Sequence, residues 1–402
     1  MHVNRAARLL FLPIALASLA MCVPFPPDET SGAPSKSSND TSARRDAGPA
    51  GAGSDEAEAG AGGGGAGPAE EPVDGSAPAG PRRTIDPACA GEPFDVARVR
   101  KDLAYLASPE LAGRAPGSAG DAAARRFIEE RFRCLGLQPG GDGGTFYQRF
   151  TDSEGNESSN LIGLLPGSDP ALKADVIVVG AHRDHFGRTD QDECEGLCLG
   201  ANDNASGTTT VLALALALRQ RAVAPKRTIA FVLFSSEELG CEGSHRFVDN
   251  GTTAVSMARV VYDVNFDMVG SYTQWNRRVV AHGTVGNTPG AALIKPLVTA
   301  SGLNVTTGVP GIEEDDSDYY PFCAAGIPMV SFFTHDPACY HASCDTVDKI
   351  DFTSMAKIAK IGADLTAGLA DATTDLAAYR RGARASQLGC TGFPNPADED
   401  DE

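Results

Sequence analysis

Four uninterrupted apolar runs most constrain how this chain can fold. They cover residues 175–181, 228–235, 259–268 and 328–333. Apolar side chains that continue without alternation are typical of strands buried on both faces, as in parallel sheets covered by helices. Helical apolar spacing lies between and around these runs, at residues 94–106, 119–135, 208–221, 244–249, 291–301 and 351–370. The alternation predicts an α/β fold with a mostly parallel central β-sheet flanked by helices on both faces.

Composition separates this single folded domain from the two ends of the chain. Residues 1–22 join a basic start to an apolar stretch too short to span a bilayer comfortably, which predicts a secretory signal peptide. Residues 23–84 are rich in Gly, Ala, Pro and acidic residues and predict a disordered linker. We expect the domain at residues 85–375, followed by a C-terminal extension with an acidic tail at residues 376–402.

The signal segment ends in Leu-Ala-Met-Cys, which resembles a bacterial lipobox, so Cys22 is a candidate for lipidation and membrane attachment. Ordinary signal cleavage is the alternative. The net charge is −19 and no stretch is rich in Lys or Arg, which disfavours nucleic-acid binding. Ten cysteines fit an oxidising compartment. We therefore expect an exported monomer, either secreted or lipid-anchored at the cell envelope.

Side chains that can bind metal follow each apolar run. In chain order they are His182, Glu237, Glu238, Asp267 and His341. Binding sites of open α/β sheets form outside the carboxyl ends of the strands. Five such residues at the ends of four separate strands therefore predict one shared site.

Asp203 completes this set as a candidate bridging ligand. It lies in the Gly-flanked segment 200–207, where the backbone can approach a ligand closely. Imidazole nitrogens and carboxylate oxygens are zinc ligands, and catalytic zinc keeps one position open for water. Two Zn²⁺ with Asp203, Glu238 and Asp267 would carry a net charge of about +1, which a bridging hydroxide neutralises. The sequence predicts two Zn²⁺, and it leaves a separate Ca²⁺ site open.

The neighbouring acids Glu237 and Glu238 are expected to have different roles, because adjacent like charges repel. If Glu238 binds metal, Glu237 can face the water as general base. Asp184 points the same way as His182 on an extended segment and can accept its second ring N–H. We expect His185 to face away from the site.

Two close cysteine pairs lie beside this site, Cys194 with Cys198 and Cys339 with Cys344. A short disulfide in either place would stiffen a loop that carries a ligand. The first pair lacks the further ligands of a structural zinc site, which favours a disulfide there.

The quoted segments resemble peptidase family M28, and within it the secreted bacterial aminopeptidases of the Streptomyces type. The resemblance covers about residues 95–372 and keeps the order of the motifs. The segments that carry it are residues 106–114, 181–187, 200–207, 234–240, 265–270, 317–318 and 339–346.

This resemblance implies a catalytic domain with one zinc on His182 and Asp267, a second on Glu238 and His341, and Asp203 between them. It also implies that Glu237 is the base and later the proton donor to the leaving amine. Tyr340 would support the negative charge that develops on the carbonyl oxygen. A disulfide between Cys339 and Cys344 has a counterpart in the same relatives.

Two positions depart from the family pattern. Many relatives have Ser-Asp-His where this chain has Tyr319 in the third place. An Arg that helps to hold the substrate is replaced by Asp316, so substrate anchoring is not carried over. The acidic run at residues 313–316 can attract a cationic N-terminus or a basic side chain, and a solvated acidic loop is the alternative.

The expected activity is that of an exported di-zinc aminopeptidase acting on peptide or protein N-termini. A carboxypeptidase or dipeptidase is the main alternative, since Arg183 and Arg188 are near enough to hold a substrate carboxylate. A glutaminyl cyclase would need one zinc and fewer ligands. A surface lipoprotein that binds without catalysis would usually have lost the base or a ligand, and none is lost here.

Overall fold

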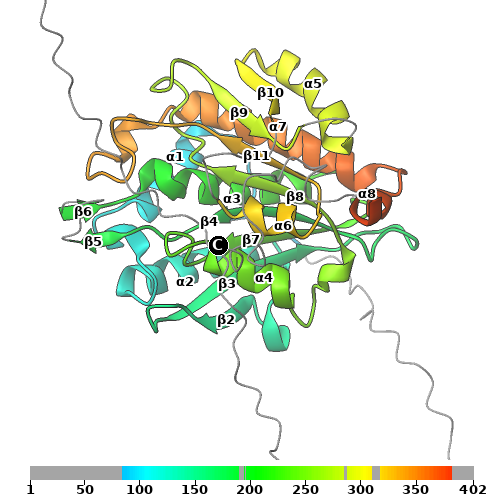
Figure 1. Cartoon of the computed structure of the whole chain (residues 1–402), viewed down its shortest axis with the longest axis horizontal. Coiled ribbons are helices and arrows are strands. Elements are labelled where there is room, and N and C mark those ends of the chain that lie inside the picture. The colour runs from blue at the N-terminus through cyan, green and yellow to red at the C-terminus, as the bar shows by residue number, and fades with distance from the viewer. Residues whose placement is uncertain (1–83, 190–193, 195, 285–287, 310–316, 383–402) are drawn as a thin grey trace, which may run out of the picture. The chain divides into compact units, whose positions relative to one another are not determined.

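The computed structural model describes residues 84–189, 194, 196–284, 288–309 and 317–382 (Figure 1). The predicted signal peptide with Cys22, the linker, the acidic run at 313–316 and the acidic tail therefore lie outside the described residues. Within the described part of the chain, no helix is long and apolar enough to cross a membrane.

The centre of the main sheet consists of the four strands predicted from the continuous apolar runs. They are β4 (Val176–His182), β7 (Thr228–Phe234), β8 (Val260–Asp267) and β11 (Met329–Phe333). Strand β4 pairs in parallel with β7 and β8, and β11 pairs in parallel with β8. Every residue of β4, β8 and β11 is buried, as expected for strands covered on both faces.

Shorter or more polar strands extend this parallel centre on both sides. The strand order is β1-β3-β7-β4-β8-β11-β9-β10, with β2 paired to β3. Strand β3 (Glu157–Leu165) is antiparallel to β7, and β9 (Val279–His282) is antiparallel to β11. The remaining strands are β1 (Gln138–Pro139), β2 (Tyr147–Thr151) and β10 (Val305–Val309), with a separate ribbon of β5 (Gly187–Thr189) and β6 (Gly196–Cys198).

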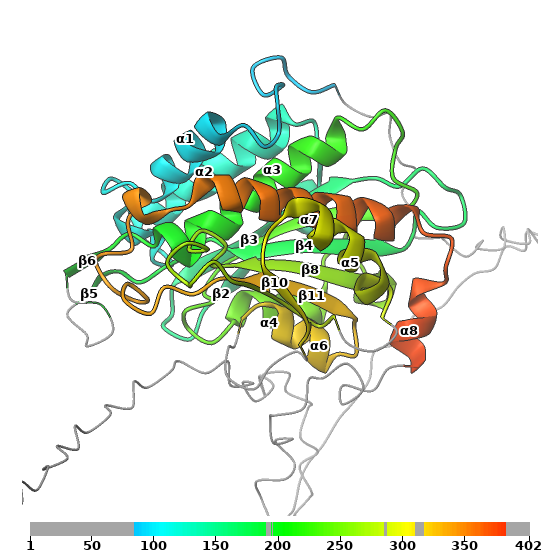
Figure 2. The same cartoon turned by 90° about the horizontal axis from the view of Figure 1, so that it is seen from above.

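Helices cover both faces of the sheet (Figures 1 and 2). On one face lie α1 (Val96–Leu106), α2 (Ala119–Cys134), α3 (Gly207–Arg219) and α7 (Phe352–Asp371). On the other face lie α4 (Glu242–Asn250) and α6 (Tyr319–Ala324). Helix α5 (Pro289–Ser301) packs against α7, and α8 (Leu376–Gly382) packs against β8. The predicted fold class and the predicted helices are confirmed.

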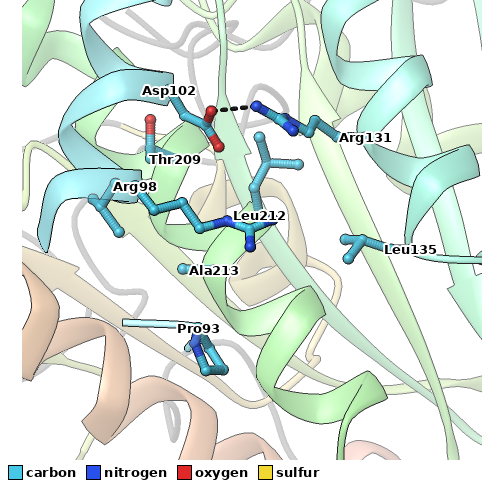
Figure 3. Close-up of a pocket in the computed structure, with 9 residues that line it drawn as sticks. Pro93, Arg98, Asp102, Arg131, Leu135, Thr209, Leu212 and Ala213 are labelled. Carbon is cyan, nitrogen blue, oxygen red and sulfur yellow. Dashed lines mark hydrogen bonds and ion pairs between the residues drawn. The ribbon is translucent and has the colours of Figure 1, made fainter. Parts of the chain in front are cut away.

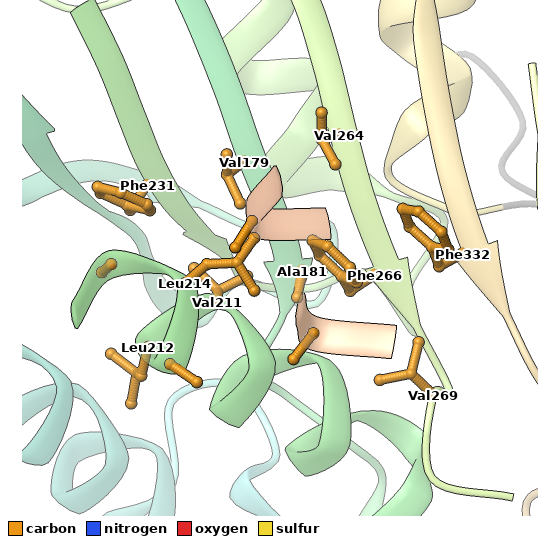
Figure 4. Close-up of a cluster of buried hydrophobic side chains, with 14 of the residues drawn as sticks. Val179, Ala181, Val211, Leu212, Leu214, Phe231, Val264, Phe266, Val269 and Phe332 are labelled. Atoms are coloured by element: carbon orange, nitrogen blue, oxygen red, sulfur yellow. The ribbon is translucent and has the colours of Figure 1, made fainter. Parts of the chain in front are cut away.

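The largest apolar cluster joins α3 to the central strands (Figure 4). Phe231, Phe266 and Phe332 from the strands meet Val211 and Leu214 from the helix, and all five side chains are fully buried. Burial of one such side chain stabilises the fold by about 1.5–3 kcal/mol. This packing fixes α3 against the sheet, and α3 begins directly after the segment that carries Asp203.

The two predicted disulfides are confirmed. Cys194 bonds to Cys198, and Cys339 bonds to Cys344. The sequence did not reveal a third bond, which joins Cys89 to Cys134 at the end of α2. Cys241 and Cys323 are also disulfide-bonded.

Candidate metal centre

The candidate ligands lie at the edge of the sheet where the parallel central strands end. His182 is the last residue of β4, and Asp267 is the last residue of β8. Glu237 and Glu238 follow β7 after two serines, and His341 lies in the loop between β11 and α7. The structure thus brings together the side chains that the strand pattern placed at one edge.

Two histidines approach the same carboxylate from opposite directions. His182 Nε2 lies 3.3 Å from Asp203 Oδ1 and 3.3 Å from Asp267 Oδ1. His341 Nε2 lies 3.3 Å from Asp203 Oδ2 and 3.5 Å from Glu238 Oε2. Asp203 therefore offers one oxygen to each half of the cluster.

These spacings fit metal ligands better than they fit ordinary contacts. Four donors bound tetrahedrally to zinc at about 2.0–2.1 Å lie about 3.3 Å from one another. Both halves of the cluster have that spacing, and every member supplies a nitrogen or a carboxylate oxygen. His182, Asp203 and Glu238 form one group whose ligand atoms all lie within 4.8 Å, and His182, Glu237 and Asp267 form another. The residues present therefore fit a zinc centre.

Backbone hydrogen bonds hold the segment that carries Asp203. The N–H groups of Asn202 and Asp203 donate to the carboxylate of Asp345, at 2.8 and 3.0 Å. The side chain of Asn204 donates to the carbonyl of Phe266, one residue before the ligand at the end of β8. The segment is thereby tied both to β8 and to the loop after His341.

Arg114 ties three further segments together, and no sequence pattern indicated this role. It is fully buried in the short 3₁₀ helix Ala112–Arg114. Its guanidinium donates at 2.7–2.9 Å to four carbonyl oxygens, those of Leu106, Arg183, Leu199 and Gly200. Burial lowers the pKa of Arg114 to about 10, so it stays charged at neutral pH. The quoted motif at residues 106–114 ends on this arginine, which was the available signal.

Glu237 lies slightly apart from the other carboxylates. Its Oε2 is 3.8 Å from His182 Nε2, and its Oε1 is 3.6 Å from Cys241 Sγ. Burial, together with the nearby charges of Glu238 and Asp267, raises the pKa of Glu237 well above its usual value. The pKa of its neighbour Glu238 is raised in the same direction, with burial as the largest cause for both, so the position of Glu237 and not its pKa separates it from the candidate ligands.

Asp184 faces His182 but does not bond to its ring. Asp184 Oδ1 is 3.9 Å from His182 Nδ1, beyond hydrogen-bond distance. Its other oxygen accepts the backbone N–H of Glu238 at 3.4 Å. The expected hydrogen bond from the His182 ring to Asp184 is therefore not formed, and Asp184 instead joins the segment after β4 to the segment after β7.

The expectation that His185 faces away from the site is wrong. His185 is fully buried, and its Nδ1 lies 2.6 Å from Glu238 Oε1. Strand β4 ends at His182, so the alternation of an extended strand no longer decides where His185 points. Burial lowers the pKa of His185 to about 4.

The loop that carries His341 also places Tyr340. His341 has a left-handed backbone, with φ of 49°, inside the loop closed by the Cys339–Cys344 disulfide. The Tyr340 ring stacks on the His341 ring at 3.7 Å between centroids and remains 39% exposed. Partial burial and the carboxylates of Asp203 and Glu238 raise the pKa of Tyr340, which keeps the phenol protonated.

Of the two arginines considered for holding a substrate carboxylate, Arg183 is already paired inside the protein. Arg183 is fully buried, pairs with Asp121 and donates to the carbonyl of Ser159 at 2.9 Å. It therefore cannot reach a substrate. The side chain of Arg188 and the acidic run at 313–316, which includes Asp316, lie outside the described residues. Tyr319 is buried at the start of α6, with its ring stacked on His282.

A small pocket between α1, α2 and α3 contains no ligand candidate of this centre (Figure 3). Its charged lining residues already have partners. Arg131 pairs with Asp102, and Arg98 donates to the carbonyl of Cys89 at 2.8 Å. Each of these charged side chains is therefore already paired within the protein.

The α/β sheet and the buried cluster of histidines and carboxylates at its edge define the class of zinc metallopeptidases. Comparison with known proteins gives the family. The model of peptidase family M28 matches residues 160–366, about half of the chain, and the chain belongs to that family.

Two curated relatives and one solved structure illustrate the likeness. Leupeptin-inactivating enzyme 1 of Streptomyces exfoliatus is 30% identical over 277 residues, which cover 63% of this chain and 56% of the relative. Aminopeptidase YwaD of Bacillus subtilis is 28% identical over 227 residues, covering 54% and 45%. The chain thus spans about half the length of the curated relatives it matches. The structure of BSAP, a zinc aminopeptidase from Bacillus subtilis, has a TM-score of 0.55 at 17% identity, covering 74% of this chain and 98% of that one. Identity this low shows a shared fold alone.

Proposed function

We propose that the chain is an exported aminopeptidase that binds two zinc ions and removes N-terminal residues from peptides. The observation that carries the proposal is the position of Asp203, with one oxygen 3.3 Å from each of two histidines. A carboxylate that faces two donor sets at once is suited to bridge two ions. We place this activity in residues 85–375. Aminopeptidases among the relatives support the assignment.

His182 and Asp267 would hold one ion, Glu238 and His341 the other, and Asp203 both. When bound there, zinc would supply Lewis-acid chemistry, lowering the pKa of a water and polarising a peptide carbonyl. Glu237 would accept a proton from the attacking water and return it to the departing amine. Its place beside His182, at 3.8 Å and outside both proposed ligand sets, leaves its carboxylate available for both steps.

Two further side chains complete the proposed site. Asp184 accepts the backbone N–H of Glu238 and so orients the segment that carries this ligand. Tyr340 remains a neutral phenol and donates its O–H to the oxygen on which charge develops.

The alternative activities are less well supported. A carboxypeptidase would need a free cation near the centre, whereas Arg183 is buried against Asp121. A cyclase with one zinc would not need a second donor set, yet His341 and Glu238 supply one. A protein that binds without catalysis would not need Glu237 next to the ligands.

The test is hydrolysis of aminoacyl p-nitroanilides by the zinc-loaded chain. Substrates with Leu, Lys and N-acetyl-Leu would be compared for the wild type, Glu237→Gln and the control Glu242→Gln. Glu242 is a partly buried carboxylate on α4 that accepts the N–H of Ser153 outside the cluster. We expect cleavage of the free-amine substrates only, a loss of roughly 10²–10⁴-fold in Glu237→Gln at unchanged zinc content, and little change in the control.

Two results would contradict this proposal. Equal cleavage of the N-acetyl substrate would exclude recognition of a free amine. No cleavage by a protein that holds two zinc ions would reject the aminopeptidase assignment and favour dipeptides or C-terminal substrates.

We also propose export, with Cys22 as the site of a lipid anchor. Disulfides at three described cysteine pairs support an oxidising compartment. Fractionation of cells that express the full chain or Cys22→Ser tests the anchor. Lipidation predicts that the wild type is in the membrane fraction and that the variant is released, whereas equal release of both would leave signal cleavage alone.

A further inference from the structure

The segment after β4 and the segment after β7 contact each other beside the candidate metal ligands. The first carries His185 and the second carries Glu238. The His185 ring lies against the backbone of Gly200, where an added Cβ would come within 2.6 Å of ring atom Cγ. Gly200 also has a positive φ of 59°, which favours glycine. The imidazole is therefore packed closely against the backbone of Gly200.

The contact distances distinguish a hydrogen bond from shared metal binding. His185 Nδ1 lies 2.6 Å from Glu238 Oε1 and 3.8 Å from Asp203 Oδ2. Donors on one tetrahedral zinc would be about 3.3 Å apart, the spacing seen among the candidate ligands. A separation of 2.6 Å is too short for that and matches a charge-assisted hydrogen bond. His185 thus binds the carboxylate of Glu238 and is not a further ligand of the same ion.

This contact leaves the two oxygens of Glu238 with different surroundings. Oε1 faces His185, and Oε2 faces His341 at 3.5 Å. The backbone N–H of Glu238 donates to Asp184 at 3.4 Å. Neighbouring residues of one segment therefore hold Glu238 at both its main chain and its side chain.

We propose that His185 is a positioning residue, whose Nδ1–H donates to Glu238 Oε1 and leaves Oε2 alone to bind the zinc shared with His341. Without this donor the carboxylate can rotate, and its orientation toward the ion is lost. Hydrogen-bond partners of metal ligands typically contribute 10–100-fold to metal affinity. The effect should be confined to the half of the centre formed by Glu238 and His341. This inference rests on the two-zinc function proposed above.

The experiment measures zinc affinity and does not depend on catalysis. The metal-free full chain is titrated with Zn²⁺ in competition with a chromophoric chelator, for the wild type, His185→Phe, His185→Asn and His245→Asn. Asn offers an N–H near the place of Nδ1, and Phe offers none. His245 is a partly buried histidine on α4 whose ring contacts Tyr320, so it is a matched control.

We expect His185→Phe to weaken one of two zinc-binding steps by roughly 10–100-fold and to leave the other within threefold. His185→Asn should recover at least part of that loss, and His245→Asn should bind like the wild type. If the Phe variant does not fold, as judged by its circular dichroism, His185→Leu replaces it in the comparison with Asn.

Unchanged affinities in His185→Phe would overturn the inference, and so would an Asn variant as weak as the Phe variant. A wild type that binds two zinc ions without aminopeptidase activity would contradict the proposed function, while the variant affinities would still decide the role of His185. A wild type that binds a single ion would overturn both.

Discussion

The four-carbonyl contact of Arg114 leads to a quantitative prediction. Replacing Arg114 by Met keeps an unbranched side chain of similar length but removes every donor from a fully buried site. The carbonyls of Leu106, Arg183, Leu199 and Gly200 would then lose a charged partner at 2.7–2.9 Å. Because three of these carbonyls are next to or inside segments that lead to candidate ligands, stability and metal affinity should decline together.

The magnitude follows from the number of bonds and the buried charge. Hydrogen bonds to a charged group contribute about 1.5–3 kcal/mol each, so four give a gross loss of about 6–12 kcal/mol. Removing the buried charge also removes its desolvation cost, which is several kcal/mol. We expect the free energy of unfolding of Arg114→Met to be about 4 kcal/mol lower than that of the wild type. For a domain of this size, that lowers the melting temperature by about 8 °C.

The assay is thermal and denaturant unfolding of the metal-free protein for Arg114→Met, Arg114→Lys and Arg133→Met. Lys keeps the charge but donates from one nitrogen, so we expect an intermediate loss. Arg133 is 59% exposed and pairs with Glu129 along α2, and its loss should cost under about 1 kcal/mol. If the free energy of unfolding of Arg114→Met lay within about 1 kcal/mol of that of the Arg133→Met control, the reasoning would be refuted.

Three further predictions concern a buried acid, the phenol and the metal. Burial and the charge of Asp318 raise the pKa of Asp263 well above its usual value. The contribution of Asp263 to stability is therefore present below its unfolded pKa of about 4 and is lost as pH rises through the folded pKa. In denaturant titrations, Asp263→Asn should be more stable than the wild type by about 1–3 kcal/mol at pH 8, and the difference should close near pH 4. Tyr340→Phe should lower kcat on the order of 10²-fold in steady-state assays at unchanged zinc content, and a change in KM alone would contradict its role. Chelation of zinc should lower the melting temperature with little change in circular dichroism, and Zn²⁺ but not Mg²⁺ should restore it, because nitrogen ligands suit zinc.

The centre of the fold was predictable from sequence because its strands are buried on both faces. Such strands leave continuous apolar runs, and the predicted and observed limits of β4, β7, β8 and β11 agree within two residues. Strand β3 was missed because it begins with polar residues that the fold buries. Asn160, for example, donates to the carbonyl of Gly243 and to the side chain of Gln148. A sequence pattern cannot distinguish such satisfied polar residues from those of a loop.

The same limit separates the candidate ligands from the residues around them. His182 and Asp267 end strands, so the topology of a parallel sheet indicates where they meet. His185 lies in non-repetitive backbone and Arg114 ends a three-residue 3₁₀ helix with a positive φ of 67°, so no periodicity relates their sequence positions to direction. Their contacts depend on tertiary packing, and only the folded structure reveals them.

Hydrogen bonds around the centre offset the repulsion between its buried carboxylates. Asp203, Glu238 and Asp267 lie close together in a buried place, where like charges repel and water is excluded. The segment that carries Asp203 is held by bonds that do not involve the clustered carboxylates: Asp345 accepts the backbone N–H groups of Asn202 and Asp203, and Arg114 donates to the carbonyl of Gly200. Because the framework is fixed by these bonds, the geometry for metal can exist before metal binds. Zinc then neutralises carboxylates that are already in position, and little of its binding energy is spent on folding the site.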